Sequence, residues 1–132
     1  MHNSIHGIGT DLVEVARIER IIRKWDDRFL KRVFSEGEIS YCEKKAFPPQ
    51  HYAARFAVKE ALLKCIGRGL FSGLSLRDIE VVNTKEGKPE LSVHGNVHGI
   101  IDALDIIKSH VTISHTNNFA TAVVILEKTS TL

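Results

Sequence analysis

The sequence predicts one α+β domain spanning residues 1–132, with a mainly antiparallel sheet. Apolar residues at helical spacing dominate the first half, and short strand-like segments dominate from Asp78 onward. A turn-rich stretch, residues 83–89, joins two of those segments as a hairpin. With 43% hydrophobic and 26% charged residues, a chain of this length can bury a core without disulfides or a metal.

Composition also limits the class of protein. Cys42 and Cys65 lie far apart with no CxxC, so no zinc or redox motif is visible, and this usage suits a reducing cytosol. The net charge of +2 argues against bulk binding of nucleic acid. No apolar run approaches the ~20 residues of a membrane span, and no signal peptide is visible. We therefore expect a cytoplasmic protein with neither a membrane nor a nucleic acid as partner.

The first predicted strand is Ile5–Val13. Gly7 and Gly9 alternate on one face, and Asp11 follows on that same face. Glycine inside a strand often marks a close approach of another backbone, and it leaves space around Asp11. The other interpretation is a bulge followed by a helix-capping aspartate.

The next segment, Val15–Trp25, has the apolar stripe of an amphipathic helix. Basic residues lie opposite that stripe and continue into residues 26–33: Arg17, Arg20, Lys24 and Arg28, with Lys31 and Arg32. Such a face can simply be solvated, or it can receive an acidic partner.

Ser35 and Glu38 form a capping box that predicts a helix running to about Lys45. A loop is expected at Phe47–Pro49. Residues 55–67 then read as one helix, because good helix formers dominate and Gly67 stands where helices commonly end.

This central helix has two distinct sides. Apolar residues at helical spacing form the core side: Val58, Ala61, Leu62, Cys65 and Ile66. Glu60 and Lys64 fall on another side among small residues, which leave room for a ligand. An exposed Glu–Lys pair at i,i+4 is the plainer interpretation.

The rest of the chain is predicted to be strand-rich. The glycine-rich residues 68–73 are too irregular for a Walker-type phosphate loop. Strands are expected at residues 79–82, 90–93, 111–115 and 119–126, the last one central, with a helix at residues 96–107. His115 ends its strand beside Ser114 and Thr116. It is either a hydrogen-bonded core histidine or part of a functional loop edge.

Five motifs in order resemble the holo-acyl-carrier-protein synthase family of small phosphopantetheinyl transferases, over nearly the whole chain. They are Gly7–Asp11 with Arg17-Ile18, Phe34–Glu38, Arg55–Ala61 with Lys64 and Gly67, the Gly87–Pro89 turn, and Ser114–Thr116 followed by Ala120. Two positions depart from the usual pattern: Phe56 stands where many relatives have Trp, and Thr10 where an apolar residue is common.

The resemblance implies an activity and an assembly. Members move the 4′-phosphopantetheine arm of coenzyme A to a serine of acyl carrier protein, releasing 3′,5′-ADP, as a step that serves fatty acid biosynthesis. Their active sites lie between the subunits of a homotrimer.

The resemblance also implies roles for residues. Asp11 and Glu60 would ligate Mg²⁺, and Lys64 would neutralise the transferred phosphate. The nucleotide end of coenzyme A would be held by Lys44 or Lys45, Arg55, Lys88, Pro89, His115 and the adjoining Thr116. The acidic carrier protein would dock on Arg17, Arg20, Lys24 and Arg28.

The chemistry agrees with these residue types. Phosphoryl-type transfer needs charge neutralised on non-bridging oxygens, and Mg²⁺ takes one or two carboxylates while keeping waters and phosphates. The base that deprotonates the serine remains open among Glu60, a metal-bound water and a second carboxylate.

Two other classes remain open on the residues alone. Asp11 with Glu43-Lys44-Lys45 loosely resembles the D…ExK set of metal-dependent nucleases. A non-catalytic module could use only the basic helix to bind an acidic protein.

Overall fold

The computed structural model describes residues 2–68 and 73–130. The elements in chain order are β1 (His2–Glu14), α1 (Val15–Trp25), α2 (Asp27–Val33), α3 (Glu36–Glu43), α4 (Pro48–Cys65), the 3₁₀ turn η1 (Leu76–Asp78), β2 (Ile79–Asn83), β3 (Pro89–Val93), α5 (Gly95–Ala103), β4 (Ile106–His115) and β5 (Phe119–Ser130). The predicted α+β class is confirmed. Most of the glycine-rich loop, residues 69–72, lies outside the described residues.

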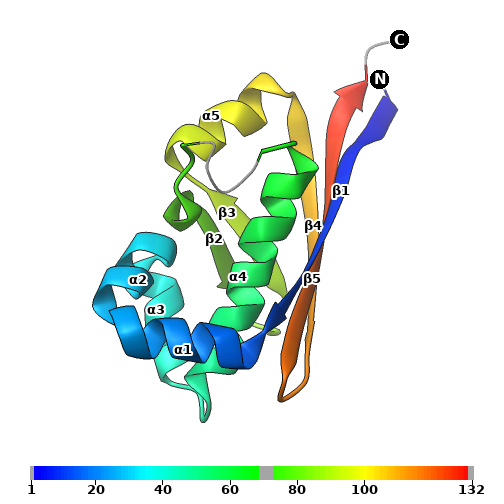
Figure 1. The fold of residues 1–132 in the computed structure, drawn as a ribbon. Helices are drawn as coiled ribbons and strands as arrows, with labels where there is room; N and C mark the ends of the chain where they lie inside the picture. Colours follow the sequence, from blue (N-terminus) through cyan, green and yellow to red (C-terminus); the bar gives the residue numbers. More distant parts are fainter. Residues whose placement is uncertain (1, 69–72, 131–132) are drawn as a thin grey trace.

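All strand pairing in the described part of the chain is antiparallel. One sheet has the order β1-β5-β4, and β2 and β3 form a separate hairpin. Val124 on β5 pairs with Gly9 on one side and Val111 on the other, so β5 is central, as predicted. Helix α4 runs across one face of this sheet, with α1, α3 and the hairpin on its other sides (Figure 1).

Helix α4 is the centre of the core. Pro48 occupies its first turn, where the missing N–H is not needed. The chain leaves the helix through Gly67, whose φ of 70° is readily available to glycine. Because α4 is packed on several sides, nearly all its residues from Tyr52 to Leu63 are buried, including Arg55 and Lys59. The prediction of a single core side was therefore too narrow.

Two glycines set the distance between β1 and α4. A Cβ at Gly7 would come within 2.5 Å of the Cys65 carbonyl oxygen, and one at Gly9 would overlap the Ala61 carbonyl oxygen. The strand and the helix thus touch backbone to backbone, as the alternating glycines predicted. This contact brings Asp11 on β1 beside the last turns of α4.

Several predicted boundaries were wrong. Helix α3 ends at Glu43, not Lys45, and α4 begins at Pro48 inside the expected loop. The helix expected at residues 96–107 ends at Ala103, because Asp105 takes a positive φ of 57° and the next residues join β4. The apolar Ile106 and Ile107 fit both periodicities, and pairing with β5 decides in favour of the strand. Strands β1, β4 and β5 are also longer than predicted.

A fully buried ion pair ties α4 to the elements on its far side from the sheet. The Lys59 ammonium donates to Glu38 Oε1 at 2.7 Å and to the carbonyl oxygens of Leu76 and Ile79. Glu38 also accepts the backbone N–H groups of Ser35 and Val81. The capping box predicted at Ser35 is confirmed, and its glutamate serves three elements at once.

The face of the three-stranded sheet that points away from α4 remains open in the part of the chain described. Ile8 and Leu12 on this face are 61% and 65% exposed. Val123 and Ile125 of β5 share the face and are half-buried. No helix within residues 2–68 and 73–130 is long and apolar enough to cross a membrane.

Candidate active site

Asp11, Glu60 and Lys64 form one cluster at the contact between β1 and α4. The Lys64 ammonium donates to Asp11 Oδ1 at 3.1 Å and to the Thr10 carbonyl oxygen at 2.9 Å. The Glu60 Oε1 atom is buried and has no hydrogen-bond partner among residues 2–68 and 73–130. A buried carboxylate oxygen of this kind is costly unless a ligand completes it.

Electrostatics in this cluster favour a cationic ligand. Burial raises the pKa of Glu60, and the neighbouring Asp11 carboxylate raises it further. Lys64 and Arg17 act in the opposite direction on the pKa of Glu60. Arg17 therefore lies close enough to connect the basic face of α1 with the carboxylates.

A second group lies around Arg55 on another side of α4. The buried guanidinium donates to Asn83 Oδ1 at 2.6 Å and stacks 4.0 Å from the centre of the Tyr41 ring. The Lys45 ammonium lies 4.5 Å from the centre of that ring. Arg55 Nε is buried and unpartnered within the described residues. This group is cationic and has donor capacity left for an anion.

His115 borders the same hollow, a pocket of about 240 Å³ that Arg55 and Pro89 also line. Its ring is exposed and meets the ring of His51 edge-on, with the centroids 5.5 Å apart. The turn after β4 is fixed to α4, because Gln50 Nε2 donates to the Thr116 carbonyl oxygen at 2.6 Å. The core interpretation of His115 is thus wrong, and its functional role at the loop edge stays a prediction.

The two groups occupy different sides of α4. Glu60 and Arg55 are five residues apart, which separates them by about 140° around the helix axis. Four residues predicted for the nucleotide end do not line the pocket at Arg55: Lys44, Lys45, Lys88 and Thr116. Lys44 is exposed at the C-cap of α3, and Lys88 lines a neighbouring cleft with Lys108 and His110.

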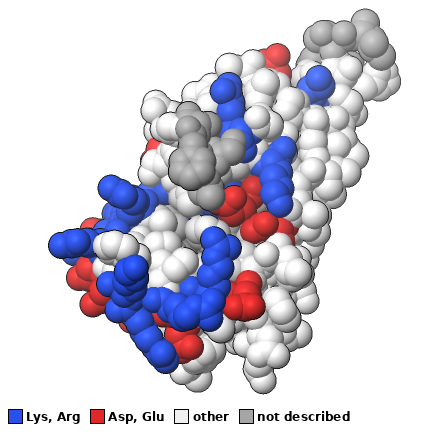
Figure 2. All heavy atoms as spheres, in the orientation of Figure 1, with Lys and Arg blue, Asp and Glu red and all other residues white. Residues whose placement is uncertain are grey.

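The predicted basic face is exposed on α1 and α2. Lys and Arg side chains gather over this end of the molecule (Figure 2). Arg17, Lys24 and Arg28 are exposed, and Arg20 makes a loose ion pair with Glu14 at 3.5 Å. Between the two helices lies a groove of about 650 Å³ whose lining is both apolar and basic: Ile21, Trp25, Arg28, Phe29 and Arg32.

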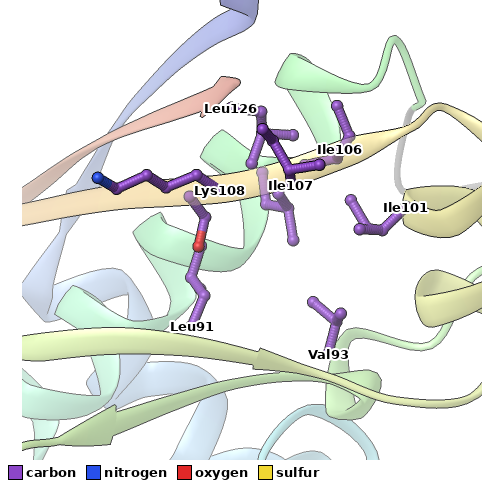
Figure 3. A pocket seen from close by; sticks show the side chains of 9 residues that line it. Leu91, Val93, Ile101, Ile106, Ile107, Lys108 and Leu126 are labelled. Atoms are coloured by element: carbon purple, nitrogen blue, oxygen red, sulfur yellow. The ribbon is translucent and has the colours of Figure 1, made fainter. Parts of the chain in front are cut away.

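A smaller apolar cavity of about 140 Å³ lies between β3, α5 and β4 (Figure 3). Aliphatic side chains line it, among them Leu91, Val93 and Ile101. None of the predicted site residues belongs to its lining. It is a packing gap apart from both charged groups.

Known proteins resemble this chain in sequence and fold along almost their whole length. The family model of the 4′-phosphopantetheinyl transferase superfamily matches residues 7–124. The chain belongs to this superfamily. A holo-[acyl-carrier-protein] synthase of Syntrophus aciditrophicus is 51% identical over 93% of this chain and 96% of that protein. The resemblance seen in the motifs is confirmed, and the chain is a phosphopantetheinyl transferase of the holo-[acyl-carrier-protein] synthase kind.

Solved structures of such transferases have the same fold. The holo-[acyl-carrier-protein] synthase of Neisseria meningitidis has a TM-score of 0.86 at 30% identity, covering 95% of this chain and all of that one. The Helicobacter pylori enzyme, solved in complex with coenzyme A, has a TM-score of 0.79 at 33% identity, covering 90% and 98%.

Some residues of this transferase escaped the sequence prediction. Tyr41 and Asn83 hold the Arg55 guanidinium, and Gln50 and His51 support the turn that carries His115. The spacing of Gln50 and His51 just before Arg55 on α4 could have pointed to this cluster. No local signal marked Asn83, which comes from another element.

Proposed function

We propose that the chain, as one transferase domain over residues 1–132, moves the 4′-phosphopantetheine group of coenzyme A to a serine of apo acyl carrier protein. The reaction releases 3′,5′-ADP, depends on Mg²⁺ and serves fatty acid biosynthesis. The observation that carries the proposal is the unsatisfied carboxylate of Glu60 beside Asp11 and Lys64. The free thiols of Cys42 and Cys65 suit a reducing compartment, and we infer a cytoplasmic location.

The residues at the carboxylate cluster fit Mg²⁺. No group of three or more His, Cys, Asp or Glu side chains in the described segments could enclose a metal alone. Two carboxylates with space beside them suit a cation that keeps waters and phosphate oxygens in its shell. When bound, Mg²⁺ would supply positive charge to the pyrophosphate oxygens. Asp11 and Glu60 would hold it.

Lys64 would serve the transferred phosphate. Its side chain is 55% exposed and pairs at 3.1 Å with Asp11, whose side chain is 18% exposed, so water on the lysine side weakens the pairing. The ammonium can therefore turn from Asp11 to a phosphate oxygen when a cation takes its place on the carboxylate. As a compact point charge, it can stabilise charge on the transferring group.

The cationic group at Arg55 would hold the nucleotide end. Arg55 and Lys45 offer positive charge, and the Tyr41 ring between them offers an aromatic surface. We assign His115, Thr116 and Pro89 to the same end, with Lys88 and Lys44 at its margins.

One subunit presents the two groups on different sides of α4, whereas coenzyme A must meet both in one site. We therefore infer that a neighbouring copy of the chain supplies one of them, in a homotrimer. The open sheet face with Ile8 and Leu12 supports an assembly, because exposed apolar patches mark interfaces. Sedimentation equilibrium should give a trimer, and a fully active monomer would contradict this inference.

The acidic carrier protein would dock on Arg17, Arg20, Lys24 and Arg28. The groove beside them combines an apolar surface with arginines, which suits an amphipathic acidic helix. Trp25 lies in this groove and is the protein's only tryptophan. Its fluorescence should change on titration with apo acyl carrier protein.

The decisive experiment is mass spectrometry of apo acyl carrier protein incubated with the enzyme, coenzyme A and Mg²⁺. The carrier should gain the mass of 4′-phosphopantetheine, and EDTA should prevent the gain. An unmodified carrier in the presence of folded enzyme would reject the proposal.

The two other classes lose their structural basis. Glu43 accepts a hydrogen bond from Tyr52 at 2.9 Å and Lys45 lies against Tyr41, whereas Asp11 bonds to Lys64. The D…ExK set of a nuclease is thus not assembled in the described chain. A simple docking module would not need the buried carboxylate of Glu60.

A further inference from the structure

His51 stands where it can sense the charge of a ligand in the pocket at Arg55. Its ring lies on α4, one turn before Arg55, and lines the pocket together with His115. Tyr41 from α3 meets the ring edge-on with the centroids 6.2 Å apart, and His115 from β4 meets it at 5.5 Å. His51 is thus held between two elements, with part of its ring turned to the pocket.

The charged groups around His51 are all basic. Lys45 follows α3, Arg55 belongs to α4, and His115 ends β4. Burial lowers the pKa of His51, and electrostatic repulsion from His115, Lys45 and Arg55 lowers it further. In the free protein these surroundings therefore favour the uncharged imidazole over the imidazolium.

An anion in the pocket reverses this balance. A phosphate monoester carries nearly two negative charges at pH 7. Each phosphate of the diphosphate bridge in coenzyme A is esterified on both sides and carries only one. A dianion among these cations favours the imidazolium form of His51, so binding must raise its pKa and take up a proton. Because a proton is taken up, the affinity for a ligand with a phosphate monoester should increase as the pH falls.

We propose that His51 is a specificity-determining residue that reads the phosphate monoester of coenzyme A by taking up a proton when that phosphate enters the pocket. The inference rests on the proposed function, which assigns the nucleotide end to this pocket. His51 here acts together with His115 and Arg55, and it touches neither Asp11 nor Glu60. Its contribution is selectivity and pH dependence of binding.

Isothermal titration calorimetry tests the inference. Coenzyme A and 3′-dephospho-coenzyme A, which lacks the monoester, are titrated into the intact enzyme at pH 7.0 in two buffers of different ionisation enthalpy. The wild-type enzyme should take up a fraction of a proton with coenzyme A and markedly less with the dephospho form. Its affinity for coenzyme A should rise from pH 8.0 to 6.5, by less than the tenfold that a pKa change of one unit gives below both pKa values.

His51→Gln should bind coenzyme A within about threefold of the wild type at pH 8.0, where the imidazole is neutral in both states. It should lose most of the proton uptake and most of the rise in affinity at pH 6.5. His51→Phe, which keeps a ring between Tyr41 and His115, should behave in the same way. His98→Gln is the control, because His98 is an exposed histidine on α5 outside the pocket.

The outcomes distinguish the role of His51 from the proposed transferase activity. Unchanged proton uptake in both His51 variants, or equal uptake with the dephospho form, would overturn the role of His51 and leave the transferase proposal intact. Failure of the folded wild-type enzyme to bind coenzyme A would overturn both.

Discussion

Lys59 and Lys64 lie one and a half turns apart on α4, and each pairs with one carboxylate. Lys59 and Glu38 are both wholly buried. Besides bonding to each other, Lys59 donates to two backbone carbonyl oxygens, and Glu38 accepts hydrogen bonds from two backbone N–H groups. Lys64 is 55% exposed, and the Glu60 carboxylate beside it keeps an unpartnered oxygen in the described chain. The charged groups on one side of the helix therefore have all their hydrogen-bond partners, whereas those on the other side do not.

The pKa shifts of two glutamates follow the same division. Ser35 donates to Glu80 at 2.6 Å, and this hydrogen bond lowers the pKa of Glu80. Burial without a partner raises the pKa of Glu60. Satisfied charges stabilise the fold, whereas charges left unsatisfied are available to a ligand. The difference gives a criterion for separating structural from functional ionisable residues.

The largest expected effect concerns the buried pair. Lys59→Ala should destabilise the protein by about 3–5 kcal/mol, because it leaves Glu38 buried without its counter-charge. Urea unfolding measures the difference. Lys64→Ala is the matched control and should change the free energy of unfolding by at most about 1 kcal/mol. Equal losses in the two variants would erase the distinction between the two lysines.

Substitutions in the carboxylate cluster should reduce activity and leave the protein folded. Asp11→Ala or Glu60→Ala should reduce transfer to the carrier protein at least ~10²-fold, the size expected for a major electrostatic contributor. Circular dichroism and the urea midpoint should show a folded protein. Asp102→Ala, at an exposed position on α5, should keep full activity. Mg²⁺-dependent activity retained in both site variants would remove these residues from the mechanism.

A smaller effect is expected on the basic face. Arg20→Glu with Lys24→Glu, which leave Arg17 beside the carboxylates unchanged, should raise the KM for the carrier protein about tenfold and leave the KM for coenzyme A nearly unchanged. Contacts of this kind govern encounter and register across a solvated interface. Steady-state kinetics with each substrate varied in turn separates the two constants. In the wild type, salt should raise the KM for the carrier, since exposed charges are screened over ~8–10 Å at 0.1–0.15 M.

Lys85→Glu is the control for that double variant, because Lys85 is exposed in the hairpin turn away from α1. Equal changes in both KM values would indicate a damaged fold. No change in either would show that the face is only solvated.

The smallest effect tests the satisfied carboxylate by pH. The lowered pKa of Glu80 means that its ionised form stabilises the fold above the unfolded value near 4.5, and that this stability disappears as the pH falls through the folded pKa. Glu80→Gln should cost about 1 kcal/mol or less at pH 7, and the cost should shrink as the pH falls below the unfolded value. Thermal unfolding of both proteins from pH 7 to 3 checks this. A difference that is independent of pH would show that packing, not charge, is responsible.

Local sequence patterns carried much of the fold. The alternating glycines, the capping box and the hairpin turn depend on neighbouring residues, and each was found where predicted. Helix α4 was harder, because its burial on several sides depends on elements far away in the chain. For the same reason, Lys59 looked like an ordinary helix former, although its partner Glu38 is 21 residues away. The ends of β4 depended on pairing with β5, which no local pattern contains.

The site was predictable to the extent that its motifs were. Asp11, Glu60 and Lys64 were predicted together, and the structure brings them together. The surroundings of Arg55 were not predicted, since Tyr41 and Asn83 reach it from α3 and β2 through contacts specific to this packing. Lys44 was assigned to the nucleotide end through the resemblance, yet its side chain is exposed to solvent.

The backbone contact at Gly7 and Gly9 makes the geometry of the site independent of the side chains in the core. In most proteins the spacing of a strand and a helix follows the sizes of the side chains between them, so that it drifts as the core is substituted. Here the backbone carbonyl groups of Ala61 and Cys65 on α4 lie directly against Gly9 and Gly7 on β1. The interval between Asp11 and Glu60 is therefore fixed by main-chain contacts, which need glycine at both positions. With these two glycines in place, substitutions among the core side chains can change the packing elsewhere without moving the two acids apart.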